Sequence, residues 1–139
     1  MEGHKRAALL EYDLEEEEAM TRPMSKSSRR QAILDLAGAM VDELEEWYDA
    51  HPEATFGEIE AKARELRRGF MGKALAVLIN GRDRGLQAQR PRCPQCGAEM
   101  KFAGYRDWEI HGLEGDTTLE RAYYVCPKCP GETLFPPGP

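Results

Sequence analysis

Two C-x-x-C pairs constrain the fold of this chain more than any other feature. They are C-P-Q-C at residues 93–96 and C-P-K-C at residues 126–129, separated by 29 residues, and they hold every cysteine of the chain. Each pair can present two thiolates from one turn, and four tetrahedral thiolates form a structural Zn²⁺ site. A disulfide within either pair would close a loop too short to stabilise much. The spacing therefore predicts one structural zinc ion bound by Cys93, Cys96, Cys126 and Cys129.

The segment between the pairs predicts β-strands. Residues 99–103 are expected to leave the first pair as a strand, and residues 105–110 and 117–125 to pair across a turn at 111–116. Together with both cysteine pairs, this gives a small antiparallel β zinc ribbon over residues 93–137. We expect two of its aromatic residues Trp108, Tyr123 and Tyr124 to cover the metal core.

Two amphipathic segments precede the ribbon. Apolar side chains recur at helical spacing over residues 28–50 and 55–80. Ser27 or Ser28 is expected to cap the first helix, and Thr55 with Glu58 forms a capping-box pattern at the second. The short link between them predicts an antiparallel helical hairpin at 27–81, so the expected fold class is α+β. Such a hairpin buries little area alone, so we expect it to form a homodimer or to lean on another domain.

The remaining segments are polar. Residues 1–26 contain four consecutive glutamates and Pro23, which predict an acidic, mostly disordered tail, and residues 82–92 predict a basic linker. The sequence has no apolar run of about 18 residues and no apolar signal-peptide core. We therefore expect a cytoplasmic protein that does not bind membranes and keeps its cysteines reduced.

The net charge of −6 hides a strong asymmetry. Residues 1–60 carry 16 acidic and 6 basic side chains, whereas residues 62–92 carry nine basic side chains against two acidic ones. A basic block beside a metal ribbon predicts an anionic partner, with double-stranded DNA as the first candidate; a solvated helix face is the alternative. The expected DNA contacts are Arg64, Arg67, Arg68, Lys73, Arg82, Arg84, Arg90, Arg92, Arg106 and Arg121.

No catalytic motif occurs in the sequence. Metalloprotease, phosphate-loop and nucleophile-elbow patterns are absent, and the carboxylates of the ribbon are scattered. His111 falls in the predicted turn, and four cysteines already complete a zinc shell. We therefore expect a binding module, not an enzyme, and no small-molecule substrate.

Several runs of residues follow a family pattern. They are P-E-A-T-F-G-E-I-E at 52–60, A-R-E-L-R at 63–67, R-C-P-Q-C-G at 92–97, L-E-R-A-Y-Y-V-C-P-K-C at 119–129 and L-F-P at 134–136. The region of about residues 50–137 resembles the helical leader and zinc ribbon of ISKra-group insertion-sequence transposases. The resemblance implies the N-terminal DNA-binding part, which recognises the ends of the element. Pro130 departs from the glycine that usually follows the second pair, and we expect Gly131 to take its place.

The family's catalytic acids lie in a nuclease domain downstream, so the resemblance transfers no catalytic residue to this chain. We expect either a fragment of such a transposase or a free-standing relative that binds without cutting.

Two other interpretations stay open. The acidic face of the first helix favours a protein-interaction adaptor in which the ribbon only stabilises the fold. The Cys₄ pattern also resembles that of rubredoxins, in which four cysteines bind iron in the same tetrahedral geometry. The inner segment lacks their acidic, proline-rich loop and carries Arg106 and Arg121, so an iron electron carrier is less favoured.

Overall fold

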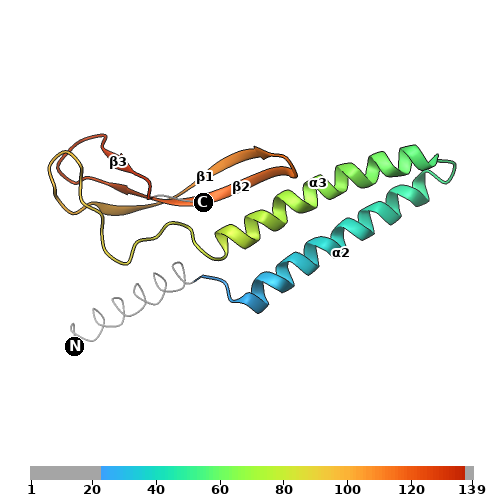
Figure 1. The fold of residues 1–139 in the computed structure, drawn as a ribbon, viewed down its shortest axis with the longest axis horizontal. Coiled ribbons are helices and arrows are strands. Elements are labelled where there is room, and N and C mark those ends of the chain that lie inside the picture. Colours follow the sequence, from blue (N-terminus) through green and yellow to red (C-terminus); the bar gives the residue numbers. More distant parts are fainter. Residues whose placement is uncertain (1–22, 137–139) are drawn as a thin grey trace, which may run out of the picture.

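Two helices and a three-stranded antiparallel sheet form the fold in a computed structural model, which describes residues 23–136. The elements are α2 (Lys26–Ala50), α3 (Phe56–Asn80), β1 (Lys101–Gly112), β2 (Gly115–Val125) and β3 (Thr133–Leu134). The predicted α+β class, a helical hairpin followed by a small antiparallel sheet, is confirmed (Figure 1). Of the tail predicted for residues 1–26, residues 1–22 lie outside the described residues, whereas Ser25 caps α2 and Lys26 begins it.

Hydroxyl caps start both helices. The side chain of Ser25 accepts a hydrogen bond from the Ser28 amide at 3.1 Å, so the predicted cap at Ser27 or Ser28 is wrong: Ser28 is the donor. At α3, Thr55 accepts the amide of Glu58 at 3.3 Å, as predicted. The Glu58 carboxylate accepts from the Thr55 hydroxyl at 3.2 Å, which holds this cap in place.

The β1–β2 hairpin is longer than the sequence predicts. Strand β1 is continuous, with one irregularity between Phe102 and Gly104, and the ladder extends to the pair Gly112↔Gly115. Only two residues therefore form the turn, which corrects the turn predicted at 111–116. Gly115 has a φ of +136°, a conformation that favours glycine, and this lets the ladder run to the tip.

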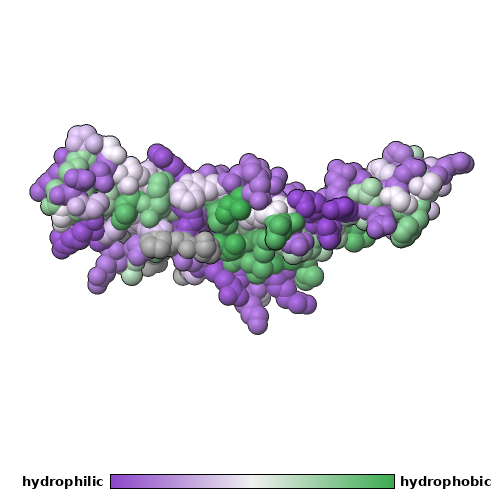
Figure 2. Space-filling model, turned by 45° about the horizontal axis from the view of Figure 1, so that its top comes forward, coloured by the Kyte–Doolittle hydropathy of each residue, from purple (hydrophilic) through white to green (hydrophobic). Residues whose placement is uncertain are grey.

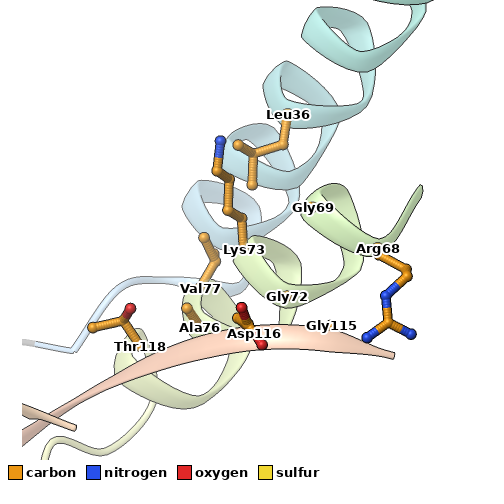
Figure 3. A pocket seen from close by; sticks show the side chains of 10 residues that line it. All are labelled: Leu36, Arg68, Gly69, Gly72, Lys73, Ala76, Val77, Gly115, Asp116 and Thr118. Carbon is orange, nitrogen blue, oxygen red and sulfur yellow. The ribbon is translucent and has the colours of Figure 1, made fainter. Parts of the chain in front are cut away.

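Helix α3 packs directly against strand β2. A Cβ on Gly72 would collide with the backbone of Asp116, and one on Gly115 would collide with the Arg68 carbonyl. The hydroxyl of Thr117 donates to the Gly72 carbonyl at 3.1 Å. Figure 3 shows Gly72 beside β2, near Asp116 and Gly115. The hairpin of strands therefore lies along α3 (Figure 1).

The second edge of β2 is covered by the segment that follows α3. The Asn80 carboxamide donates to the Thr118 carbonyl at 3.0 Å and accepts from the Glu120 amide at 2.9 Å. Farther along, the Ala122 amide donates to the Arg84 carbonyl at 2.7 Å. Strand β3 then takes over, with the pair Tyr124↔Leu134. The predicted linker at 82–92 thus contacts the sheet.

The buried core lies at the cysteine end of the sheet. It contains Cys93, Met100, Ala122, Tyr124 and Cys126. In contrast, α2 has no buried residue, and α3 buries only two small ones. Among residues 23–136, neither helix has the length and apolar character required to cross a membrane.

Of the aromatic residues expected over the metal core, only Tyr124 belongs to it. Trp108 and Tyr123 instead pack against Phe135, with ring centroids 5.1 and 5.9 Å apart.

Candidate metal centre and basic surface

The four cysteine sulfurs come together at one end of the sheet. All four Sγ atoms lie within 4.8 Å of one another, and those of Cys96 and Cys126 are 3.5 Å apart. Cys93 and Cys126 are buried, Cys129 is half-buried and Cys96 is exposed. Such a cluster can hold one metal ion through sulfur ligands alone, as the C-x-x-C spacing predicts.

Backbone hydrogen bonds shape both cysteine turns. In the first, the Cys93 amide donates to the Ala98 carbonyl at 2.8 Å, and the Gly97 amide donates to the Cys93 carbonyl at 2.9 Å. In the second, the amides of Lys128 and Cys129 donate to Cys126 Sγ at 3.4 and 3.3 Å. These bonds hold each turn in a conformation in which both of its thiols lie in the cluster.

Gly131 completes the second turn. Its φ of +82° lies in the left-handed region, which the ring of Pro130 cannot reach. The Glu132 amide then donates to the Cys129 carbonyl at 3.3 Å. Gly131 therefore supplies the left-handed backbone conformation in this turn.

The electrostatics of the cluster favour a bound cation. Burial raises the pKa of the Cys126 thiol, but the amides of Lys128 and Cys129 and the neighbouring thiols outweigh it and lower that pKa to about 7. Hydrogen bonding to Cys96, burial and the Cys126 thiolate raise the pKa of Cys129 to about 12. One thiolate therefore forms readily and opposes the next, whereas a central metal ion would allow all four to ionise.

A second group of possible ligand atoms lies at the hairpin tip. Glu109, His111 and Asp116 place their side-chain atoms within 4.8 Å of one another, all exposed. The 2.9 Å bond between His111 Nδ1 and Asp116 Oδ1 raises the pKa of His111. A turn at 111–116, as predicted from the sequence, gives no reason to expect this contact, but His111 and Asp116 form a directly opposed pair of the ladder.

The predicted DNA contacts are unequally accessible. Arg68 and Arg84 are half-buried: Arg68 donates to the Leu113 carbonyl at 3.1 Å, and Arg84 lies 4.2 Å from the Tyr105 ring. Arg106 is exposed, with its guanidinium 4.5 Å from the Tyr123 ring. The other exposed members are Arg64, Arg67, Lys73, Arg82, Arg90 and Arg92.

Arg121 has a structural position. It is 4% exposed, and its guanidinium donates to the Asp83 carbonyl at 3.0 Å. This burial contradicts the DNA contact predicted for it. Strand periodicity placed it on a face with Leu119 but could not show that the segment after α3 covers that face.

Charge is distributed unequally along the ribbon and the segment before it. Residues 82–106 carry six basic and two acidic side chains, whereas residues 107–120 carry five acidic ones and neither lysine nor arginine. The first segment leads into the cysteine cluster, and the second surrounds the hairpin tip. We call residues 82–106 the basic segment. Lys101 and Lys128, which the sequence analysis did not select, are also exposed at the cysteine end.

Comparisons of the chain with protein-family models, with curated proteins and with solved structures found no match.

Proposed function

We propose that this protein is a nucleic-acid-binding module whose partner is double-stranded DNA. The observation that carries the proposal is the charge polarity of the ribbon. The basic segment carries six basic side chains, and residues 107–120 carry five acidic ones, of which Glu120 lies beside the basic segment, 3.7 Å from Arg84. Phosphate is attracted to the first and repelled by the second, so the duplex approaches from the cysteine end.

The metal of the cysteine cluster is, in this proposal, a single structural Zn²⁺. Four thiolates around Zn²⁺ carry a net charge of −2, which the excess of four positive charges in the basic segment exceeds. Four protein ligands also leave no open coordination position for a substrate or water. The ion orders the two cysteine turns and thereby fixes the neighbouring basic side chains relative to one another.

Exposed arginines of the basic segment make the phosphate contacts. Arg90 and Arg92 lie directly before the first cysteine turn, and Arg106 lies on β1. Phosphate contacts position a protein on the duplex without reading its sequence, so binding through these residues is tolerant of sequence. Recognition of the ends of an element, which the resemblance suggests, would require base contacts in addition to these.

Equilibrium binding to a labelled random duplex tests the proposal. A double variant, Arg90→Gln and Arg92→Gln, is compared with a control double variant, Lys26→Gln and Arg30→Gln. Both sets are exposed and lose the same charge, but the control residues lie on the helices. We expect at least tenfold weaker binding for the first variant and less than threefold for the control. Equal binding by all three proteins would contradict the proposal.

A further inference from the structure

An open apolar groove runs along the helical hairpin. It has a volume of about 660 Å³, and its lining comes from α2 and α3 without any residue of the sheet. Met40, Leu44, Ala63 and Leu66 supply apolar lining. From α3, Arg64 and Arg67 add two positive charges and Glu60 adds one negative charge. The sheet packs elsewhere on α3, at Gly72, so it leaves this groove uncovered.

An exposed apolar stripe on α2 follows one side of the groove. Leu34, Val41 and Tyr48 are 49%, 53% and 44% exposed, and they recur at intervals of seven residues. Side chains seven residues apart share one edge of a helix, as in helices that pack against a partner helix. Val41 itself lines the groove. Apolar residues also reach the surface at the helical end of the molecule in Figure 2.

The two helices carry opposite charges that do not pair with each other among residues 23–136. Residues 31–50 of α2 include six acidic side chains and no lysine or arginine, whereas α3 carries five basic and three acidic ones. Over the helices as described, the only salt bridge is Lys62 with Glu65, and it lies within α3. Asp42 and Glu45 of α2 and Arg64 and Arg67 of α3 are exposed and form no salt bridge within residues 23–136, so they are available to a second molecule.

We infer that the occupant of this groove is the hairpin of a second copy of the chain, which gives a symmetric four-helix dimer. Helix α2 of each copy lies against α3 of the other. The stripe Leu34–Val41–Tyr48 enters the partner's groove, and Asp42 and Glu45, beside the stripe, face the guanidinium groups on the partner's α3. The alternative pairing of α2 with α2 would bring two acidic helices together, and like charges oppose it.

The available area suits this assembly. A helix of 25 residues is about 37 Å long, so a face two helices wide covers on the order of 700 Å². Stable interfaces bury roughly 800 Å² per partner. Pairing α2 with the partner's α3 places the two-fold axis along the helices. Both cysteine clusters then lie at the same end of the dimer.

Sedimentation equilibrium tests the dimer directly. The chain has a mass of 15.7 kDa, and we expect the metal-loaded protein to reach twice that value at micromolar concentration. Val41→Asp should raise the dimer dissociation constant at least tenfold. The control Leu113→Asp makes the same kind of change at a residue that is 94% exposed on the hairpin tip and should change it less than twofold. A monomer at all concentrations, or a dimer unaffected by Val41→Asp, would overturn the inference.

Charge exchange tests which helices pair. The double variant Arg64→Glu, Arg67→Glu should weaken the dimer at least tenfold, because acid then faces acid. The double variant Asp42→Lys, Glu45→Lys should do the same, because base then faces base. The combination of all four substitutions should restore association to within about threefold of the parent. If the first double variant dimerises like the parent, or if the combination does not recover, the pairing of α2 with the partner's α3 is wrong.

Discussion

Gly72 determines how closely helix α3 approaches strand β2. A methyl group there would overlap the backbone of Asp116, and backbone atoms of a paired strand have little room to move. Gly69, one turn earlier on the same helix, has no heavy atom within 4 Å of the corresponding position. Substitutions at the two glycines can therefore distinguish the effect of close packing on stability from the entropic cost of a glycine within a helix.

Alanine at these two positions should change stability in opposite directions. Gly69→Ala should raise the free energy of unfolding by roughly 0.5–1 kcal/mol, because alanine loses less backbone entropy on folding. Gly72→Ala should lower it by about 1–3 kcal/mol through overpacking. Urea denaturation followed by circular dichroism measures both. If both variants gain stability equally, the close contact between α3 and β2 does not exist.

At the scale of elements, the side-chain amide of Asn80 forms the hydrogen bonds that a neighbouring strand would otherwise form at the edge of β2. Asn80 donates to the Thr118 carbonyl and accepts from the Glu120 amide, as a paired backbone would. Unpaired strand edges attract other chains, so this cover also protects the sheet. The contact joins the end of α3 to the middle of the ribbon.

Asn80→Leu should lower the free energy of unfolding by about 1–3 kcal/mol, because two polar groups of β2 lose their partner. Gln31→Leu is the matched control, since the amide of Gln31 bonds only to Asp35 on the exposed surface of α2 at 2.8 Å. Its effect should stay within about 0.5 kcal/mol. Thermal unfolding of the two variants provides the comparison. Equal effects would show that Asn80 does not hold the edge of β2.

Local signals in the sequence predict the helices and the cysteine cluster well. Thr55 and Glu58 mark the start of α3, and the C-x-x-C spacing identifies all four sulfurs that meet. The docking of α3 on β2 could not be predicted, because it depends on Gly72 and on the polar Asn80, which leave no apolar pattern. The wrong DNA contact at Arg121 has the same cause. The strand pattern does not reveal that the segment after α3 covers this side chain.

At the scale of the whole molecule, the core is confined to the cysteine end, while the hairpin of helices contains no metal ligand. Zinc binding is worth about 10–16 kcal/mol in peptide models, so it should supply most of the stability of the cysteine turns. The helices have their own caps and an apolar interface. The two halves should therefore respond differently when the metal is removed.

Gently purified protein should contain one equivalent of zinc, and chelation should release it. Amide exchange should then accelerate at Cys93, Gly97 and Cys126, while the helical signal in circular dichroism is retained. The thiolates that bind the metal compete with protons, so affinity should fall as pH is lowered, and it should fall more steeply below about 7, where the Cys126 thiol also takes up a proton. Less than half an equivalent of metal would contradict the metal site. Loss of nearly all helical signal on chelation would contradict the independence of the helices from the metal.

The salt dependence of DNA binding tests the proposed function most directly. Each phosphate contact releases counterions and contributes about −0.9 to the slope of log K against log salt. The double variant of Arg90 and Arg92 should therefore have a slope shallower than the parent's by about 1.8, whereas the Lys26 and Arg30 control should keep the parent's slope. A parent that does not bind duplex at low salt, or three equal slopes, would contradict the account.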